Sequence, residues 1–349
     1  MKDIVQLSDI QLIPLTKTVR KENISDEIYF SDEYSKYISN SRLKYINPKQ
    51  DGSPRLYQEN PRIESTSLAI GSAVHEVLLQ PEEFELAPKI GKPSAKLGQV
   101  MDYIPKFLVN GYTLEESIKK AALKAKYYVN SIDSRIETIK AAWIDYSSKL
   151  KELKEIPNKK ELIILSDKDH DTVERCLKSC YDNRAIMSKL HPTDVFGDQI
   201  PSFNEDALFM DYLVVYKGRC FTLKFKMKAD NWSINFDDKI ITLNDVKTSG
   251  HHIEGFMDGS FINFNYARQM GCYSAVLWEY CAKEFGVSTK TGWKLDANML
   301  VVETIPNHLS GCFNVPREEL ARGKRQFDRL MKMVGYYNIF GFDKEVEFV

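Results

Sequence analysis

Two short runs of alternating residues, joined by a polar turn within residues 220–250, constrain the fold of this chain more than any other feature. Successive side chains of a β-strand point to opposite faces, so a period of two predicts a strand with one apolar face. Asp230 ends the first predicted strand, and Asp245 and Lys247 share one face of the second. The predicted hairpin therefore brings two carboxylates and an ammonium together at one end. Three lysines share the face of Asp230, namely Lys224, Lys226 and Lys228.

This charge arrangement has a chemical interpretation. Two carboxylates from adjacent strands supply the oxygen ligands that a hard cation such as Mg²⁺ prefers, and they leave positions for water and a phosphate. An ammonium two residues beyond the second carboxylate can orient the attacking water, help to deprotonate it, or offset charge in the transition state. The alternative is a surface hairpin with ordinary charges, because charged residues make up 28% of the chain.

Length and composition narrow the class of protein. A chain of 349 residues that is 43% hydrophobic can bury a sizeable core, as one large domain or as a core with insertions. Its formal charge of -1 provides no global basic field, so any contact with a polyanion has to come from local patches. The first fifteen residues lack the pattern of a secretory signal, and no apolar stretch approaches membrane-spanning length. We expect a cytoplasmic protein that does not enter a membrane.

Cysteine and histidine spacings argue against a zinc ribbon and a disulfide scaffold. Of the six cysteines only Cys176 and Cys180 are close in sequence, and no Cys-x-x-Cys motif occurs. The six histidines likewise show no spacing typical of zinc proteases. We expect reduced and mostly buried thiols.

The remaining apolar patterns predict helices around a sheet. The segment 161–183 predicts a strand followed by a helix that begins near Ser166 or Asp167. The expected fold class is α/β (α+β), with a central mixed β-sheet that contains an antiparallel meander over about 205–247 and is flanked by helices. Further predicted helices cover 66–80, 266–286 and 316–337, and further predicted strands cover 207–216 and 298–303. The segment 114–156 is helix-prone and predicts either an inserted helical arm or two packed helices.

Two of these helices carry polar residues that have both a structural and a functional interpretation. His75 lies one turn after Gly71 in a mostly apolar helix, where an isolated histidine is more often structural than a ligand. Tyr266, Gln269 and Tyr273 lie at helical spacings on one face of the helix after the hairpin. An aromatic stripe is usually core, but a glutamine within it needs hydrogen-bond partners, which an active site or a nucleic acid could provide.

Four motifs occur in a characteristic order and together resemble the PD-(D/E)xK nuclease superfamily. They are GSAVHEVLLQPEEF at 71–84, Glu205 before a strand, Asp230 followed by Asp245-Val246-Lys247-Thr248, and Tyr266-x-x-Gln269-x-x-x-Tyr273. The resemblance is greatest to the phage-type exodeoxyribonuclease VIII (RecE-like) branch, and it extends to lambda exonuclease and RecB-type nuclease domains. It spans roughly residues 35–340, and it implies a restriction-endonuclease-like core with a helical insertion.

The resemblance also implies roles for individual residues. Lys247 would position the nucleophilic water, Glu205 would be an auxiliary acid, and Gln269 would support the site. Two features depart from the pattern: alanine rather than proline precedes Asp230, and the four-cysteine iron-sulfur motif of some relatives is missing, so we expect no cluster. The implied metal ligands are His75, Asp230, Asp245 and the carbonyl of Val246, and Tyr266 or Tyr273 would support the site or contact the DNA end. Because Lys224, Lys226 and Lys228 share the face of Asp230, we expect them to line a channel for DNA.

The expected function is that of a metal-dependent deoxyribonuclease. It would use Mg²⁺ or Mn²⁺ to activate a water, and it would degrade linear double-stranded DNA from its ends for recombination or repair. A restriction-like or structure-specific endonuclease of the same fold is one alternative. A DNA-binding protein with a degenerate nuclease core is another, although the presence of Asp230, Asp245 and Lys247 argues against it.

The resemblance further implies partners and a domain organisation. A single-strand annealing protein would be the functional partner, a ring-shaped homo-oligomer would thread the DNA, and the protein would be phage-encoded or act in a bacterial cytoplasm. We expect one nuclease domain over 1–349. Its expected parts are an N-terminal extension (1–65), a first core helix with its connector (66–112), a helical insertion (113–157) and the catalytic core (158–349).

Overall fold

A computed structural model describes residues 3–15, 18–22, 24–61 and 66–349. The chain forms two compact units, of which the first combines residues 1–63 with 180–349 and the second covers 64–179. This division does not test the prediction of a single nuclease domain. In the described part of the chain, no helix is both long enough and apolar enough to cross a lipid bilayer.

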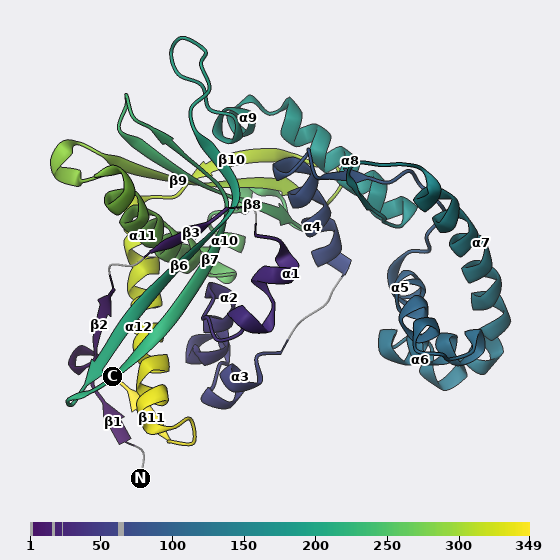
Figure 1. Ribbon diagram of the computed structural model, residues 1–349, viewed down its shortest axis with the longest axis horizontal. Coiled ribbons are helices and arrows are strands. Elements are labelled where there is room, and N and C mark those ends of the chain that lie inside the picture. Colours follow the sequence, from purple (N-terminus) through teal and green to yellow (C-terminus); the bar gives the residue numbers. More distant parts are fainter. Residues whose placement is uncertain (1–2, 16–17, 23, 62–65) are drawn as a thin grey trace. The chain divides into compact units, whose positions relative to one another are not determined.

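The first unit is built on a mixed seven-stranded sheet, as predicted (Figure 1). The strand order is β10-β9-β8-β7-β6-β2, and β3 also pairs with β6. Every pair is antiparallel except β8 with β9, which are parallel and are connected through helices. The strands are β2 (Gln11–Pro14), β3 (Val19–Lys21), β6 (Ser202–Tyr216), β7 (Arg219–Asn235), β8 (Ile240–Ser249), β9 (Lys294–Glu303) and β10 (Ser310–Asn314).

The predicted meander is present as β6, β7 and β8. Its first turn consists of Lys217 and Gly218, which both have a positive φ, of 48° and 74°. Two such residues match the twist of the flanking strands, as in type I′ hairpins. The strands are longer than the sequence patterns predict, because β6 begins before Glu205 and β7 continues beyond Asp230.

Helices α11 (Tyr266–Phe285) and α12 (Arg317–Phe340) run side by side along the sheet (Figure 1). They are in very close contact, since a Cβ atom on Gly323 would lie 1.7 Å from the carbonyl oxygen of Ala267. The ring of Phe327 on α12 lies 5.0 Å from that of Phe225 on β7, so α12 packs against the sheet and buries this part of the core. Both helices were predicted from their apolar periodicity.

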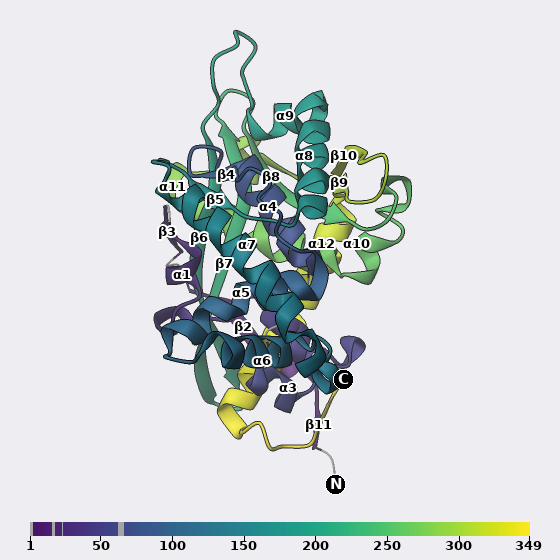
Figure 2. The same cartoon turned by 90° about the vertical axis from the view of Figure 1, so that its right-hand side faces the viewer.

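Shorter elements complete the first unit. The short helix α9 packs against β8 and β10 (Figure 2). The N-cap of α2 is Ser39, whose side chain accepts a hydrogen bond from the backbone N–H of Arg42. The elements are α1 (Asp26–Tyr29), α2 (Asn40–Leu43), α3 (Pro54–Glu59), α9 (Arg184–Leu190), α10 (Ser260–Asn263) and the parallel pair β1 (Asp3–Val5) and β11 (Val346–Phe348).

The second unit is mainly helical and has its own core, to which Met101, Ile118 and Trp143 contribute. Helix α8 begins after Ser166, whose hydroxyl accepts a hydrogen bond from the N–H of Asp169, as predicted. Helix α5, which contains Pro105, lies in the region expected to be a connector and was not predicted. The elements are α4 (Thr66–Leu79), β4 (Phe84–Leu86), α5 (Ala95–Val109), α6 (Leu114–Ala125), α7 (Ile136–Glu155), β5 (Glu161–Ile163) and α8 (Asp167–Asp182), the last of which ends in the first unit.

A chain of asparagine side chains crosses five strands of the sheet. Each amide nitrogen donates to the side-chain oxygen of the asparagine on the neighbouring strand, from Asn314 to Asn298 (3.3 Å), to Asn244 (3.0 Å), to Asn231 (2.7 Å) and to Asn204 (2.7 Å). The three central residues are at most 2% exposed. Hydrogen bonds in such a chain polarise one another, and only one register of the strands aligns all five amides.

We predict that Asn244→Ala destabilises the fold by about 2–4 kcal/mol, because it leaves buried amide atoms of Asn231 and Asn298 without this partner. The matched control is Asn314→Ala, which removes only the longest hydrogen bond, at the exposed end of the chain, and is expected to change stability by less than about 1 kcal/mol. Urea unfolding monitored by circular dichroism measures both. Equal stability of the two variants would contradict this role of the amide chain.

Candidate active site

The predicted acidic residues lie where two paired strands separate. The pairing of β7 with β8 stops at Asn231 and Asn244, one residue short of Asp230 and Asp245. The carboxylate of Asp230 instead accepts the backbone N–H of Val246 at 2.8 Å. The prediction that Asp230 ends its strand is therefore wrong, because β7 extends five residues further. The prediction that Asp230 lies at the end of the hairpin pairing agrees with the structure.

Beyond this point the segment that contains Tyr29, Tyr34 and Ile38, here called the N-terminal segment, takes the place of β8 beside β7. The N–H of Ile38 donates to the carbonyl of Lys224 at 2.7 Å, and the N–H of Lys226 donates to the carbonyl of Ile38 at 2.8 Å. The backbone of β7 thus has partners on both sides of Asp230. Asp230 therefore lies between the part of this edge that bonds to Ile38 and the part that pairs with β8.

Lys247 lies among three of the predicted ligand groups. Its ammonium is 2.5 Å from Oδ2 of Asp245, 3.2 Å from the carbonyl oxygen of Val246 and 4.0 Å from Oδ2 of Asp230. Burial works to lower the pKa of Lys247, but the neighbouring Asp245 and Asp230 carboxylates raise it, and the net shift is upward. The two carboxylates therefore favour the ammonium form of this side chain.

Helix α11 supports this cluster from the side. Gln269 donates its amide to Oδ1 of Asp245 at 2.6 Å, which leaves Oδ2 of that carboxylate directed at Lys247. The ring of Tyr266 lies 5.6 Å from the ammonium of Lys247. Tyr273 is partly buried against the core, and burial raises its pKa well above the usual value. DNA contacts by these tyrosines stay predictions.

Glu205 lies within β6, three residues after its start, and not before the strand as predicted. Its φ is 54°, a left-handed conformation that is uncommon for residues other than glycine and is often found at functional sites. A carboxylate oxygen of Glu205 lies within 4.8 Å of one of Asp230. Lys228 offsets this repulsion, since its ammonium is 2.7 Å from Glu205 and 2.8 Å from Asp26. Burial works to lower the pKa of Lys228, but Glu205 and Asp26 raise it overall.

The lysine-rich face of β7 is covered by the N-terminal segment. Lys226 is 5% exposed, and its ammonium donates to the carbonyl of Tyr29 at 2.5 Å. The expected DNA contact by Lys226 does not fit this burial, because the rings of Tyr29 and Tyr34 lie 4.2 and 5.9 Å from its ammonium. Lys224 is exposed and lies over the ring of Tyr37. A DNA contact by Lys224 or Lys228 stays a prediction.

His75 is half-buried on α4, in the second unit. Its predicted role as a metal ligand is not tested by the geometry of the first unit. The helix around it was predicted and is present.

Sequence patterns missed several residues that contribute charge near these strands. Asp26 pairs with Lys228 although it is 202 residues away, so no local pattern could indicate the pair. His252, Glu254 and the fully buried Glu303 also have potential ligand atoms within 4.8 Å of one another, where β8 and β9 end. Spacing could have suggested the first two, but Glu303 comes from another strand.

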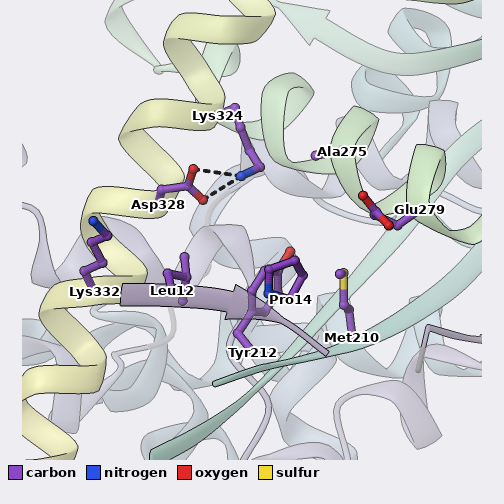
Figure 3. A pocket seen from close by; sticks show the side chains of 9 residues that line it. All are labelled: Leu12, Pro14, Met210, Tyr212, Ala275, Glu279, Lys324, Asp328 and Lys332. Atoms are coloured by element: carbon purple, nitrogen blue, oxygen red, sulfur yellow. Dashed lines mark hydrogen bonds and ion pairs between the residues drawn. The ribbon is translucent and has the colours of Figure 1, made fainter. Parts of the chain in front are cut away.

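A cavity of about 290 Å³ lies elsewhere in the first unit, between β2, β6, α11 and α12 (Figure 3). Lys324 and Asp328 form an ion pair on its wall, with both oxygens 2.7 Å from the ammonium. Tyr212 and Glu279 also line it. None of the described lining residues belongs to the acidic cluster, so this cavity is separate from the candidate site.

Comparisons with known proteins do not identify the chemistry of the site. No family model and no curated protein matches the chain. Among solved structures, it is similar to a crystal structure of a protein from Eubacterium rectale that is provisionally described as an exonuclease. The two are 14% identical with a TM-score of 0.45, and the match covers 94% of this chain and 89% of the other. The chemistry of the site has to be inferred from its own residues.

We predict that Lys228→Met destabilises the protein by about 2 kcal/mol, because it leaves the largely buried Glu205 carboxylate beside Asp230 without this cation. The double variant Lys228→Met/Glu205→Gln should recover most of that loss. Asp26→Asn is the matched control and should have little effect, since Asp26 is largely exposed. Chemical unfolding of the four proteins tests this, and a double variant no more stable than Lys228→Met would contradict it.

Proposed function

We propose that the protein is a metal-dependent deoxyribonuclease that hydrolyses phosphodiester bonds of linear double-stranded DNA from its ends. The observation that carries the proposal is the grouping of the Asp230 and Asp245 carboxylates and the Val246 carbonyl around one cation, the Lys247 ammonium. The order of the four sequence motifs supports the same proposal and points to the PD-(D/E)xK superfamily. The choice of DNA and of free ends rests on that resemblance.

The donor set fits a hard divalent cation. Two carboxylates and a backbone carbonyl are oxygen ligands of the kind that Mg²⁺ and Mn²⁺ prefer, and they already surround a positive charge. Asp230, Asp245 and Val246 would hold the ion. When bound, such an ion polarises a phosphate oxygen and lowers the pKa of a water.

The protein's own residues then have separable tasks. Gln269 fixes the orientation of the Asp245 carboxylate, and the N–H of Val246 fixes that of Asp230. The ammonium of Lys247 beside Asp245 and Asp230 can donate hydrogen bonds to the attacking water and to the phosphate. Its charge offsets the negative charge that develops on the phosphate during in-line attack.

We predict that Asp245→Asn and Lys247→Met each reduce Mg²⁺-dependent cleavage of end-labelled linear duplex by at least about a hundredfold. Asp237→Asn and Lys239→Met make the same chemical changes in the exposed turn of the same hairpin and should retain activity. Circular dichroism of all four variants serves as the control for folding. Undiminished cleavage by both site variants would rule out the proposed reaction.

We predict a strict dependence on DNA ends. The wild-type protein should degrade linear duplex and leave a covalently closed plasmid intact over the same time. Linearising that plasmid with a restriction enzyme should make it a substrate. Cleavage of the closed circle would instead favour an endonuclease with the same catalytic residues.

A further inference from the structure

An exposed apolar pair lies next to the aromatic residue that contacts Lys247. Ile262 and Phe264, at the end of α10 and just after it, are 54% and 59% exposed. The ring of Phe264 lies 5.8 Å from that of Tyr266. The Tyr266 ring in turn lies 5.6 Å from the ammonium of Lys247. Phe264 is therefore separated from the catalytic cluster by a single aromatic ring.

The ring of Tyr266 is held in place by buried aromatic residues. Phe256 is 2% exposed and stacks on Tyr266, with 5.9 Å between centroids and 19° between planes. Phe313 stacks on Phe256 at 5.5 Å, and Phe261 approaches Tyr266 at 6.4 Å. Phe264 thus lies at the exposed end of a packed aromatic group. Because these rings are already held in place, a ligand that binds here has little side-chain motion to restrict.

The position of this pair identifies the ligand that would cover it. A group that covers Phe264 lies one aromatic ring away from Lys247, which the proposed function places at the phosphate. The parts of a nucleic acid adjacent to a phosphate are its sugars and bases, and every base has an apolar π-face. Stacking of a base on an aromatic side chain needs no hydrogen-bond recognition and is tolerant of sequence.

We propose that Phe264, supported by Ile262, stacks on one nucleobase of the strand that is being hydrolysed and so positions the neighbouring phosphate at Lys247. This inference rests on the proposed function and adds a substrate-contacting residue to it. A phenyl ring presents no strong hydrogen-bond donor or acceptor, so the contact does not select among the four bases.

The test combines a protein variant with removal of the base. Duplexes carrying an abasic nucleotide at each of the first six positions are compared with intact duplex, for wild type, Phe264→Ala and Phe264→Trp. Binding is measured by fluorescence anisotropy with Ca²⁺ in place of Mg²⁺, and KM and kcat are measured with Mg²⁺. Phe236→Ala is the matched control, because Phe236 is 49% exposed and packs against Phe285 and Trp293 at the opposite end of the hairpin.

We expect Phe264→Ala to raise the Kd and KM for intact duplex roughly fivefold to hundredfold. At one position an abasic nucleotide should weaken wild-type binding by a similar factor and leave Phe264→Ala unchanged. Phe264→Trp should retain wild-type affinity, since the indole also stacks. Phe236→Ala should behave as wild type on every duplex.

Three results would overturn the proposal: wild-type affinity of Phe264→Ala, an abasic effect that is the same in wild type and Phe264→Ala at every position, or a complete lack of DNA binding. The outcome for hydrolysis is separate. If Phe264 and one base show the expected coupling in Ca²⁺ but no cleavage occurs in Mg²⁺, the stacking contact stands and the proposed reaction fails. If cleavage occurs without the coupling, the reaction stands and the contact fails.

Discussion

The register of the central strands is the constraint on which the candidate site depends. Five asparagine amides are bonded from strand to strand, and three of them are buried where unmatched amide atoms are costly. Asn231 and Asn244 belong to this chain and are the immediate neighbours of Asp230 and Asp245. A shift of one residue would separate the amides and move both carboxylates to other faces. The polar interior of the sheet thereby aligns the charged residues of the site.

Charge balance explains how several carboxylates can lie so close together. Asp245 is bonded to Gln269 and Lys247, Asp230 to a backbone N–H, and Glu205 to Lys228. Each contact replaces hydration that the buried or half-buried carboxylate has lost. The same contacts limit rotation of the side chains, so the site is arranged before a ligand arrives. The left-handed backbone at Glu205 shows that part of this order is strained.

Local patterns predicted much of the fold and the centre of the site. The periods of two and 3.6 residues identified the meander, α11 and α12, and the short spacing of Asp245 and Lys247 put both beside Asp230. Three features depend on tertiary packing and could not be predicted in this way. They are the cover over Lys226, the pairing of Lys228 with Asp26, and the asparagine chain, whose members are individually unremarkable polar residues. The left-handed backbone at Glu205 could not be predicted either, because glutamate rarely adopts a positive φ and the sequence gives no sign of it.

The contact between Gly323 on α12 and Ala267 on α11 couples α12 to the candidate site, although α12 contributes no residue to that site. The two backbones are so close that no side chain fits between them, so the first turns of α11 cannot move toward α12. Gln269 and Tyr266 are carried on those turns. A methyl group added at Gly323 would therefore act as a wedge that tilts the supporting helix, and it would alter the alignment of Asp245 without touching any charged residue. The alignment of the Asp245 carboxylate therefore depends on the packing between α11 and α12 as well as on the polar groups around it.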